Sequence, residues 1–195
     1  MARHKEFDQE KALNQALELF WEKGYESTSV QDLCDKLGIN RGSLYDTFGD
    51  KRELFLACLD RFAERIEDEL NSILKEDAGD PKQQLERFFD RVIDISMNDP
   101  SRGRGCLIAN STLGDTARDP EVAGRVTAYY MNQEALFHRF LMKARQKGKL
   151  TGKHSPRELA RYLLSTRQGL LSLAKTAPDR SMLEEIYKVA LSAVF

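Results

Sequence analysis

The strongest constraint on the fold is the spacing of apolar residues, which follows the period of an α-helix along almost the whole chain. Residues 7–23 place their apolar side chains on one broad stripe and end at Gly24, a residue type that commonly stops helices. No convincing run of alternating apolar and polar residues is present, so strands are not expected. We therefore predict an all-α protein of about nine helices.

Short helices are predicted to follow Gly24. Thr28 and Gln31 fit a capping box for a helix that ends before Gly38, and Asn40 can cap the next helix, which closes at Phe48-Gly49. Asp50 and Glu53 form a second box that opens a long helix. Further helical patterns cover residues 81–97, 106–117, 119–147, 156–175 and 179–193.

Composition narrows the class of protein. The chain has 195 residues, of which 41% are hydrophobic and 31% charged, as in globular proteins. No apolar run approaches the roughly 18 residues that span a bilayer, and the start "MARHKEFDQEK" lacks a signal core, so a cytoplasmic protein without membrane contact is expected. Three cysteines, an odd number without metal-ligand spacing, predict no disulfide, metal site or cofactor.

The stretch "GINRGSLYDTF" completes the pattern of a helix-turn-helix. Its second helix is short enough to enter a DNA major groove about 12 Å wide. Arg41 can bond guanine or phosphate, Ser43 and Thr47 can bond base edges, and Tyr45 offers a ring and a hydroxyl. Gly42 inside a helix costs about 1 kcal/mol relative to alanine, and a close approach to DNA is one reason to accept that cost.

Charge does not by itself indicate DNA. The net charge is −1, and residues 1–54 hold eight Lys/Arg against eleven Asp/Glu, so any contact must come from a local patch. Lys51, beside the free N–H groups that begin a helix, fits a phosphate contact. Two short helices joined by a glycine turn also occur in all-α proteins that bind no DNA, and the residues alone leave that alternative open.

The stretches "ALELFWEKGYESTSV" and "DLCDKLGINRGSLYDTFGDKRELF" resemble the DNA-binding region of the TetR family of bacterial transcriptional repressors. The resemblance implies a helix-turn-helix domain over residues 1–50 and a ligand-binding and dimerisation domain over residues 51–195. It also implies a repressor that binds a palindromic double-stranded operator as a dimer and is released by a small-molecule effector. The DNA contacts that we expect are Arg3, Lys5, Thr28, Ser29, Arg41, Gly42, Ser43, Tyr45, Thr47 and Lys51.

Individual roles follow from the same resemblance. Thr28 is expected to cap the helix that presses on the DNA backbone, Tyr45 and Lys51 to contact phosphates, and residues 3–5, His4 included, to form an arm. Asp46 departs from the family pattern, in which many relatives carry His or a neutral residue. An acid facing DNA is unfavourable, so Asp46 either accepts a base N–H or turns aside.

Homodimerisation is expected through the last two helices, because their apolar stripes are too wide for isolated surface helices. The interface residues that we predict are Leu163, Leu170, Leu171, Tyr187 and Leu191. Alternatively, these stripes only complete the core of one subunit.

A ligand pocket is predicted where aromatic residues mix with a few polar ones. The candidates are Phe62, Phe89, Cys106, Asn110, Tyr129, Tyr130, Phe137 and Gln168. Each aromatic residue at helical spacing can equally be a core residue, and the sequence does not reveal the ligand.

Three alternatives compete with a ligand-released repressor. The first is a repressor that senses oxidants or electrophiles through Cys106. This cysteine follows a Gly-Arg-Gly turn and begins a helix near Arg102 and Arg104, which would favour a thiolate if the side chain is accessible. Some TetR-like repressors with a similar Gly-Cys-Leu segment sense oxidants or electrophiles. An enzyme built on Cys106, His138 and His154 lacks any accompanying catalytic motif, so no enzyme is expected. A helical adaptor would leave Gly42, Tyr45 and Lys51 without a role.

Overall fold

A computed structural model of the chain describes residues 7–74, 79–98 and 103–195. Over these ranges the protein consists of nine α-helices and one 3-10 helix, with no strand, which confirms the all-α prediction. Arg3, His4, Lys5 and Arg102, to which the sequence assigned roles, lie outside the described residues. No helix in the described part of the chain is both long and apolar enough to cross a membrane.

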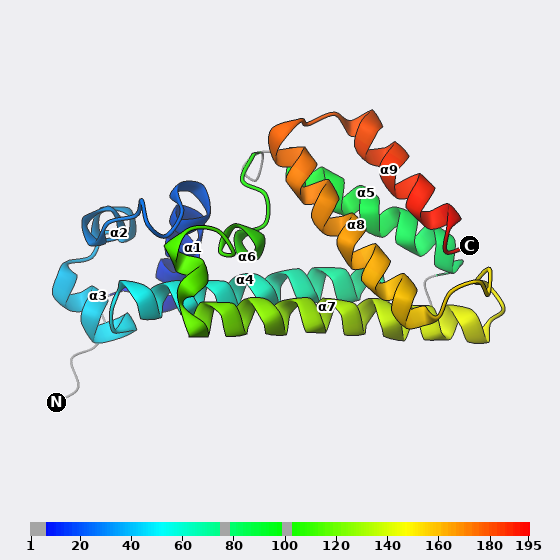
Figure 1. Cartoon of the computed structure of the whole chain (residues 1–195). Coiled ribbons are helices and arrows are strands. Elements are labelled where there is room, and N and C mark those ends of the chain that lie inside the picture. The colour runs from blue at the N-terminus through cyan, green and yellow to red at the C-terminus, as the bar shows by residue number, and fades with distance from the viewer. Residues whose placement is uncertain (1–6, 75–78, 99–102) are drawn as a thin grey trace.

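The molecule is elongated, with its N-terminal helices at one end (Figure 1). This end, which we call the head, contains α1 (Gln9–Lys23), α2 (Val30–Leu37) and α3 (Arg41–Phe48). Two long helices, α4 (Lys51–Ile73) and α7 (Pro120–Gln146), run side by side from the head to the far end. There α5 (Pro81–Met97), α8 (Pro156–Thr176) and α9 (Arg180–Ser192) complete a bundle, while α6 (Leu107–Asn110) and η1 (Asp115–Arg118) lie close to the head.

Polar caps define where the helices begin. Asn40 accepts a hydrogen bond from the Ser43 N–H at 2.8 Å, as predicted for the start of α3. The capping box of α2 is formed by Ser29 and Asp32, however, and the prediction of Thr28 with Gln31 was wrong by one residue. Thr28 instead turns inward, so the next hydroxyl along the chain is the one in position to cap.

The single helix predicted for residues 106–117 is also wrong. α6 ends after Asn110, and Gly114 adopts a positive φ of 72° before η1 begins. The N–H groups of Thr112 and Leu113 bond the carbonyl oxygens of Ala109 and Asn110, three residues earlier, so the i−4 pattern of an α-helix ends here. The chain therefore breaks into two short pieces beside the head.

The core consists of two clusters of buried residues. The first joins the head to the beginning of α4, to α6 and to the beginning of α7. The second lies between α5, α7, α8 and α9, where Phe88 and Phe89 contact Phe137 and Tyr187 through ring pairs at 5.2 and 5.5 Å. α4 contributes to both clusters, so the head packs directly on the remaining helices, which we call the body. The domain boundary at residue 50 stays a prediction.

Candidate nucleic-acid interface and candidate effector cavity

The relative position of α2 and α3 is set by a tight turn and two buried leucines. Gly38 has a positive φ of 67°, a conformation that glycine adopts without strain, and the Ile39 N–H bonds the Cys34 carbonyl oxygen at 3.1 Å. Leu33 of α2 and Leu44 of α3 are fully buried. Because Leu44 faces the core, the opposite face of α3 is turned to solvent.

That outer face carries the side chains that the sequence singled out. Arg41, Gly42 and Tyr45 are exposed, Tyr45 by 45%, and Ser43 and Thr47 are half-buried. Asp46 is exposed as well, which is compatible with both of its predicted alternatives, accepting a base N–H or turning aside from the DNA. The Arg41 guanidinium lies 3.5 Å from the Gln31 side-chain oxygen, a long contact that a DNA oxygen can replace.

Gly42 has a reason within the protein to be glycine. A Cβ atom at this position would lie 3.2 Å from the Asn40 side-chain oxygen, the atom that caps α3. The sequence offered only a close approach to DNA as an explanation. Packing against the cap is a second cause, and the two are compatible.

Other expected contacts differ in how available they are. Thr28 is fully buried and donates its hydroxyl to the Gly24 carbonyl oxygen at 2.7 Å, which argues against a DNA contact by this side chain. Ser29 is exposed but is occupied with Asp32. The Lys51 ammonium lies 4.2 Å above the Tyr25 ring, where burial lowers the pKa of the lysine.

The acidic residues of the head are partly neutralised by lysine. Lys23 bonds Asp32 at 2.8 Å and, together with the Ser29 hydroxyl, holds the pKa of that carboxyl well below its usual range. This pair lies at the N-terminus of α2, where a carboxylate is also favoured by the helix dipole. Asp32 therefore stays charged beside the surface formed by α2 and α3.

Polar links between the head and the body were not predicted from the sequence. Trp21 donates its indole N–H to the Gly105 carbonyl oxygen at 3.0 Å, and Arg104 pairs with Glu18. Arg52, at the start of α4, bonds Asp119 at 2.5 and 2.9 Å. These partners are 67 to 86 residues apart in sequence, so no local pattern could have revealed them.

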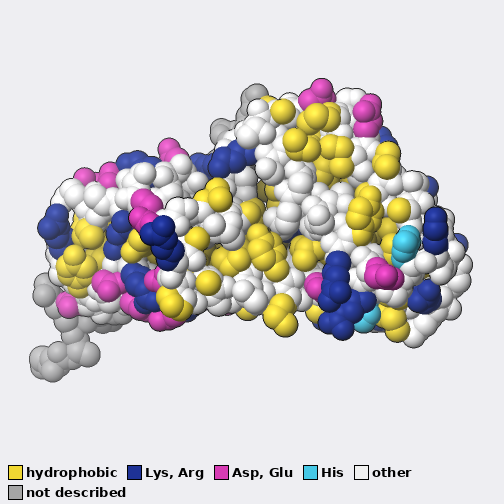
Figure 2. Space-filling model, viewed as in Figure 1, with side chains coloured by type: hydrophobic (Ala, Val, Ile, Leu, Met, Phe, Trp, Pro, Cys, Tyr) yellow, Lys and Arg dark blue, Asp and Glu magenta, His cyan; other side chains and the backbone are white. Residues whose placement is uncertain are grey.

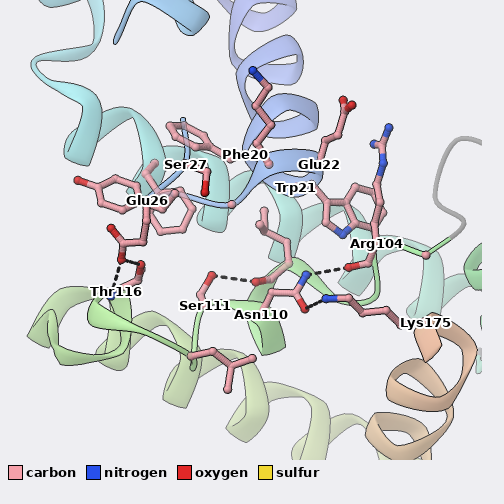
Figure 3. A pocket seen from close by; sticks show the side chains of 17 residues that line it. Phe20, Trp21, Glu22, Glu26, Ser27, Arg104, Asn110, Ser111, Thr116 and Lys175 are labelled. Atoms are coloured by element: carbon pink, nitrogen blue, oxygen red, sulfur yellow. Dashed lines mark hydrogen bonds between the residues drawn. The ribbon is translucent and has the colours of Figure 1, made fainter. Parts of the chain in front are cut away.

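An open cleft of about 670 Å³ separates the α1–α2 connection from α6 and the end of α8. Figure 3 shows Glu26 bonded to Thr116 at one side of this cleft, and Asn110 bonded both to the Arg104 carbonyl oxygen and to Lys175 at the other. Asn110, a predicted pocket residue, therefore lines an open cleft rather than an enclosed site.

A second, much smaller cavity of about 30 Å³ lies deeper, between α1, α4, α5 and α8. Phe62 and Cys106, two of the predicted pocket residues, line it together with Trp21, Ile95 and Arg167. Phe89 and Phe137 are fully buried in the second core cluster instead. Tyr130 is half-buried beside Tyr129, and both Tyr129 and Gln168 have buried polar atoms without a hydrogen-bond partner among the described residues.

Cys106 does not meet the condition for a reactive thiolate. Its side chain is 3% exposed, and burial raises the pKa of the thiol, although Arg167 and the N–H groups of Ala109 and Ile108 oppose that rise. The structure thus agrees with the alternative in which Cys106 packs at the start of α6. All three cysteines are free and buried.

Four of the predicted dimer contacts point into the subunit. Leu163, Leu170, Tyr187 and Leu191 are buried in the second core cluster, and Leu171 is half-buried against it. The wide apolar stripes are explained by the several helices that surround α8 and α9. The exposed face of these two helices carries Tyr162, Ser165, Gly169, Ser172 and Val189, the last exposed by 68%. Figure 2 shows hydrophobic side chains gathered over this part of the molecule.

Metal chemistry finds no support in the described residues. No group of three or more His, Cys, Asp or Glu side chains in this part of the chain is placed to hold a metal ion.

A helix-turn-helix head whose second helix is exposed, joined to an all-helical body, is the arrangement of many DNA-binding transcriptional regulators. The comparisons with known proteins give the family. The profile described as "Bacterial regulatory proteins, tetR family" matches residues 12–58, and that described as "Tetracyclin repressor-like, C-terminal domain" matches residues 81–190. The chain therefore belongs to the TetR family of transcriptional regulators.

Relatives cover the full length of the chain. The uncharacterized HTH-type transcriptional regulator YezE of Bacillus subtilis (strain 168) is 37% identical over 100% of both chains. The HTH-type transcriptional repressor ComR of Escherichia coli (strain K12) is 27% identical over 96% of this chain and 88% of its own length. A cysteine mutant of the TetR family regulator CifR, complexed with 26 bp double-strand operator DNA, is 26% identical, with a TM-score of 0.86 over 98% of this chain and 99% of that one.

Proposed function

We propose that the chain is a repressor that binds a palindromic double-stranded DNA operator as a homodimer and leaves it when a small-molecule effector binds the body. The single observation that carries this proposal is the outer face of α3, which is held toward solvent by the buried Leu44. The repressor ComR and the operator-bound CifR mutant support the same reading. We place this action in the cytoplasm, where a bacterial regulator meets its operator, and propose no enzymatic activity.

The proposed DNA contacts follow the exposure of the side chains. Arg41 and Tyr45 are exposed side chains able to donate hydrogen bonds, so they are assigned to a base edge and a backbone phosphate respectively. Ser43 and Thr47 flank them, and Gly42 leaves room for the duplex. Lys51 reaches a phosphate only if it leaves the Tyr25 ring, so its contribution is smaller.

The proposed dimer interface is the exposed face of α8 and α9. Ser165, Gly169 and Ser172 are small residues three or four positions apart, which lets a partner helix approach closely. Tyr162 and Val189 flank this stripe with apolar area. A two-fold pair of heads matches a palindromic operator whose half-sites lie one helical turn apart. Residues 1–50 would then read DNA, and residues 51–195 would dimerise and bind the effector.

A mobility-shift titration against the DNA upstream of the chain's own gene tests this function. Arg41→Ala and Tyr45→Ala should each weaken operator binding by about tenfold or more, the range expected for a lost base or phosphate contact, without changing the unfolding midpoint. Arg139→Ala, which removes an exposed arginine on α7, is the matched control and should bind normally. Equal affinity of all four proteins, or no retarded complex with wild type, would reject the proposal.

A further inference from the structure

Arg167 of α8 is a buried cation, and none of the described acidic residues forms an ion pair with it. Its side chain is 3% exposed, and its Nε and Nη1 atoms have no hydrogen-bond partner among the described residues. A buried guanidinium normally forms ion pairs, because leaving such a charge unpaired is strongly unfavourable. The position therefore calls for an anion.

The side chains nearest to Arg167 do not supply that anion. Glu69 lines the same cavity, but it bonds Arg91 at 2.6 Å. Cys106 also lines the cavity, and burial raises the pKa of its thiol, which keeps it neutral near pH 7. Tyr129 lies near Arg167, which opposes the rise that burial causes in the pKa of the tyrosine, but a phenol whose pKa is raised stays neutral near pH 7 and supplies no anion.

We propose that this cavity is the effector site and that the effector is an organic monocarboxylate whose carboxylate pairs with Arg167; the inference rests on the proposed function. One buried positive charge is neutralised by one negative charge, and the planar guanidinium matches the two oxygens of a carboxylate. Apart from Ser96 and the mutually paired Glu69 and Arg91, the remaining wall is mostly apolar and suits a hydrocarbon chain or ring, with Trp21, Phe62, Ile66 and Ile95. A doubly charged phosphate ester would leave one charge unpaired in this wall.

The size of the cavity links binding to DNA release. Its volume of about 30 Å³ holds one or two water molecules, or the carboxylate alone. The hydrocarbon part of the ligand must therefore displace neighbouring side chains. Among these are Trp21 of α1 and Phe62 of α4, whose ring centroids are 5.3 Å apart. Because α1 belongs to the head, entry of the ligand moves the head relative to α4.

Calorimetric titration of the full chain with benzoate and hexanoate, and with the neutral benzamide and hexanamide, tests the inference. Wild type should bind the carboxylates about tenfold to a hundredfold more tightly than the amides, the range expected for a hydrogen bond to a charged group. Arg167→Gln should lose this preference, and Arg167→Lys, which keeps the charge without the planar fork, should lose part of it. Arg161→Gln removes an exposed arginine from the same helix and should behave as wild type.

Several results would overturn the inference. These are the absence of binding by both carboxylates, equal binding of carboxylates and amides, and an unchanged preference in Arg167→Gln. If Arg167→Gln does not fold, the preference of wild type for carboxylates over amides still decides whether the cavity binds a carboxylate. Displacement of benzoate by chloride at equal concentration would reduce the site to a small-anion site and reject an organic effector.

Operator binding separates this inference from the proposed function. If the carboxylates bind but the protein retards no DNA even in their absence, the proposed function is rejected and the carboxylate site is kept. Normal operator binding with no carboxylate preference would reject the site and keep the function. Weaker operator binding with benzoate, in wild type and not in Arg167→Gln, is the expected result.

Discussion

Trp21 donates its indole N–H to the carbonyl oxygen of Gly105 at 3.0 Å, and this hydrogen bond joins the first helix of the head to the segment that precedes α6. The same segment contributes Arg104, which pairs with Glu18 and lies 5.6 Å from the Trp21 ring. The two contacts hold α1 to a part of the body that also lines the Arg167 cavity.

Trp21→Phe keeps an aromatic ring against Phe62 but removes the donor to Gly105. We expect the free energy of unfolding, measured in urea, to fall by about 1 kcal/mol or more, since the Gly105 carbonyl loses its partner. Tyr45→Phe is the control, because it removes a hydroxyl from an exposed aromatic residue. A Trp21→Phe variant as stable as wild type would show that the hydrogen bond does not secure the head.

The proximity of a Gly42 Cβ position to Asn40 predicts that two substitutions interact. Gly42→Ala should stabilise the protein little in wild type, because the gain in helix propensity, as much as about 1 kcal/mol, is offset by displacement of the cap. In the Asn40→Ala background, which itself loses about 1 kcal/mol of capping, the gain should appear in full. Urea unfolding of the four proteins measures the coupling. Additive effects, within about 0.3 kcal/mol, would contradict the crowding.

Gly169→Arg should give a folded monomer that no longer binds its operator. Gly169 is exposed on α8, with no atom within 4 Å of its Cβ position, so the arginine fits one subunit but blocks a partner helix. Gly124→Arg on α7 has the same free space and is the matched control. Sedimentation at micromolar concentration distinguishes the two variants. Leu170→Glu, by contrast, should unfold the subunit, because it places a carboxylate in the buried core.

The ion pair between Arg52 and Asp119 predicts a pH dependence of stability. The Arg52 guanidinium lowers the pKa of the Asp119 carboxyl from 3.8 to about 2. Since the folded-state pKa is depressed, the pair stabilises the protein above about pH 4, and this contribution is lost as the pH falls from about 4 to about 2. Asp119→Asn, which keeps an oxygen to cap α7, should be less stable than wild type at pH 7.

Urea unfolding at several pH values checks this prediction. The difference between wild type and Asp119→Asn should narrow below about pH 4. Asp115→Asn, which alters an exposed pair with Arg118, should match wild type throughout. A difference that stays constant down to the acid limit of folding would show that the charge of Asp119 is not its source.

The burial of all three cysteines predicts slow labelling by a chromogenic disulfide reagent in native protein and labelling of all three thiols in urea. Thiolate formation at Cys106 is disfavoured because burial raises its pKa. Cys106→Ser should leave the native rate unchanged. One rapidly reacting thiol that disappears in this variant would restore oxidant or electrophile sensing as the mode of regulation.

Local signals predicted the helices well and the contacts poorly. Gly38 and Asn40 act on residues within a turn or two, so the end of α2 and the start of α3 were readable from the sequence. Leu163 and Leu170 were placed on a dimer surface because periodicity gives the apolar face of a helix but not what covers it. Arg167 was missed for a related reason: a single arginine in an apolar stripe gives no local sign that its charge is buried.

Trp21 is the only tryptophan in the chain, and it stands where the head meets the cavity. Its indole ring is 7% exposed and packs edge-on against Phe62. The tryptophan fluorescence of each subunit, excited selectively over that of the six tyrosines, therefore comes from one residue at the junction of the head and the body. A shift of its emission to longer wavelength would report water entering this junction, so the motion of the head can be timed in the unlabelled protein by stopped-flow mixing.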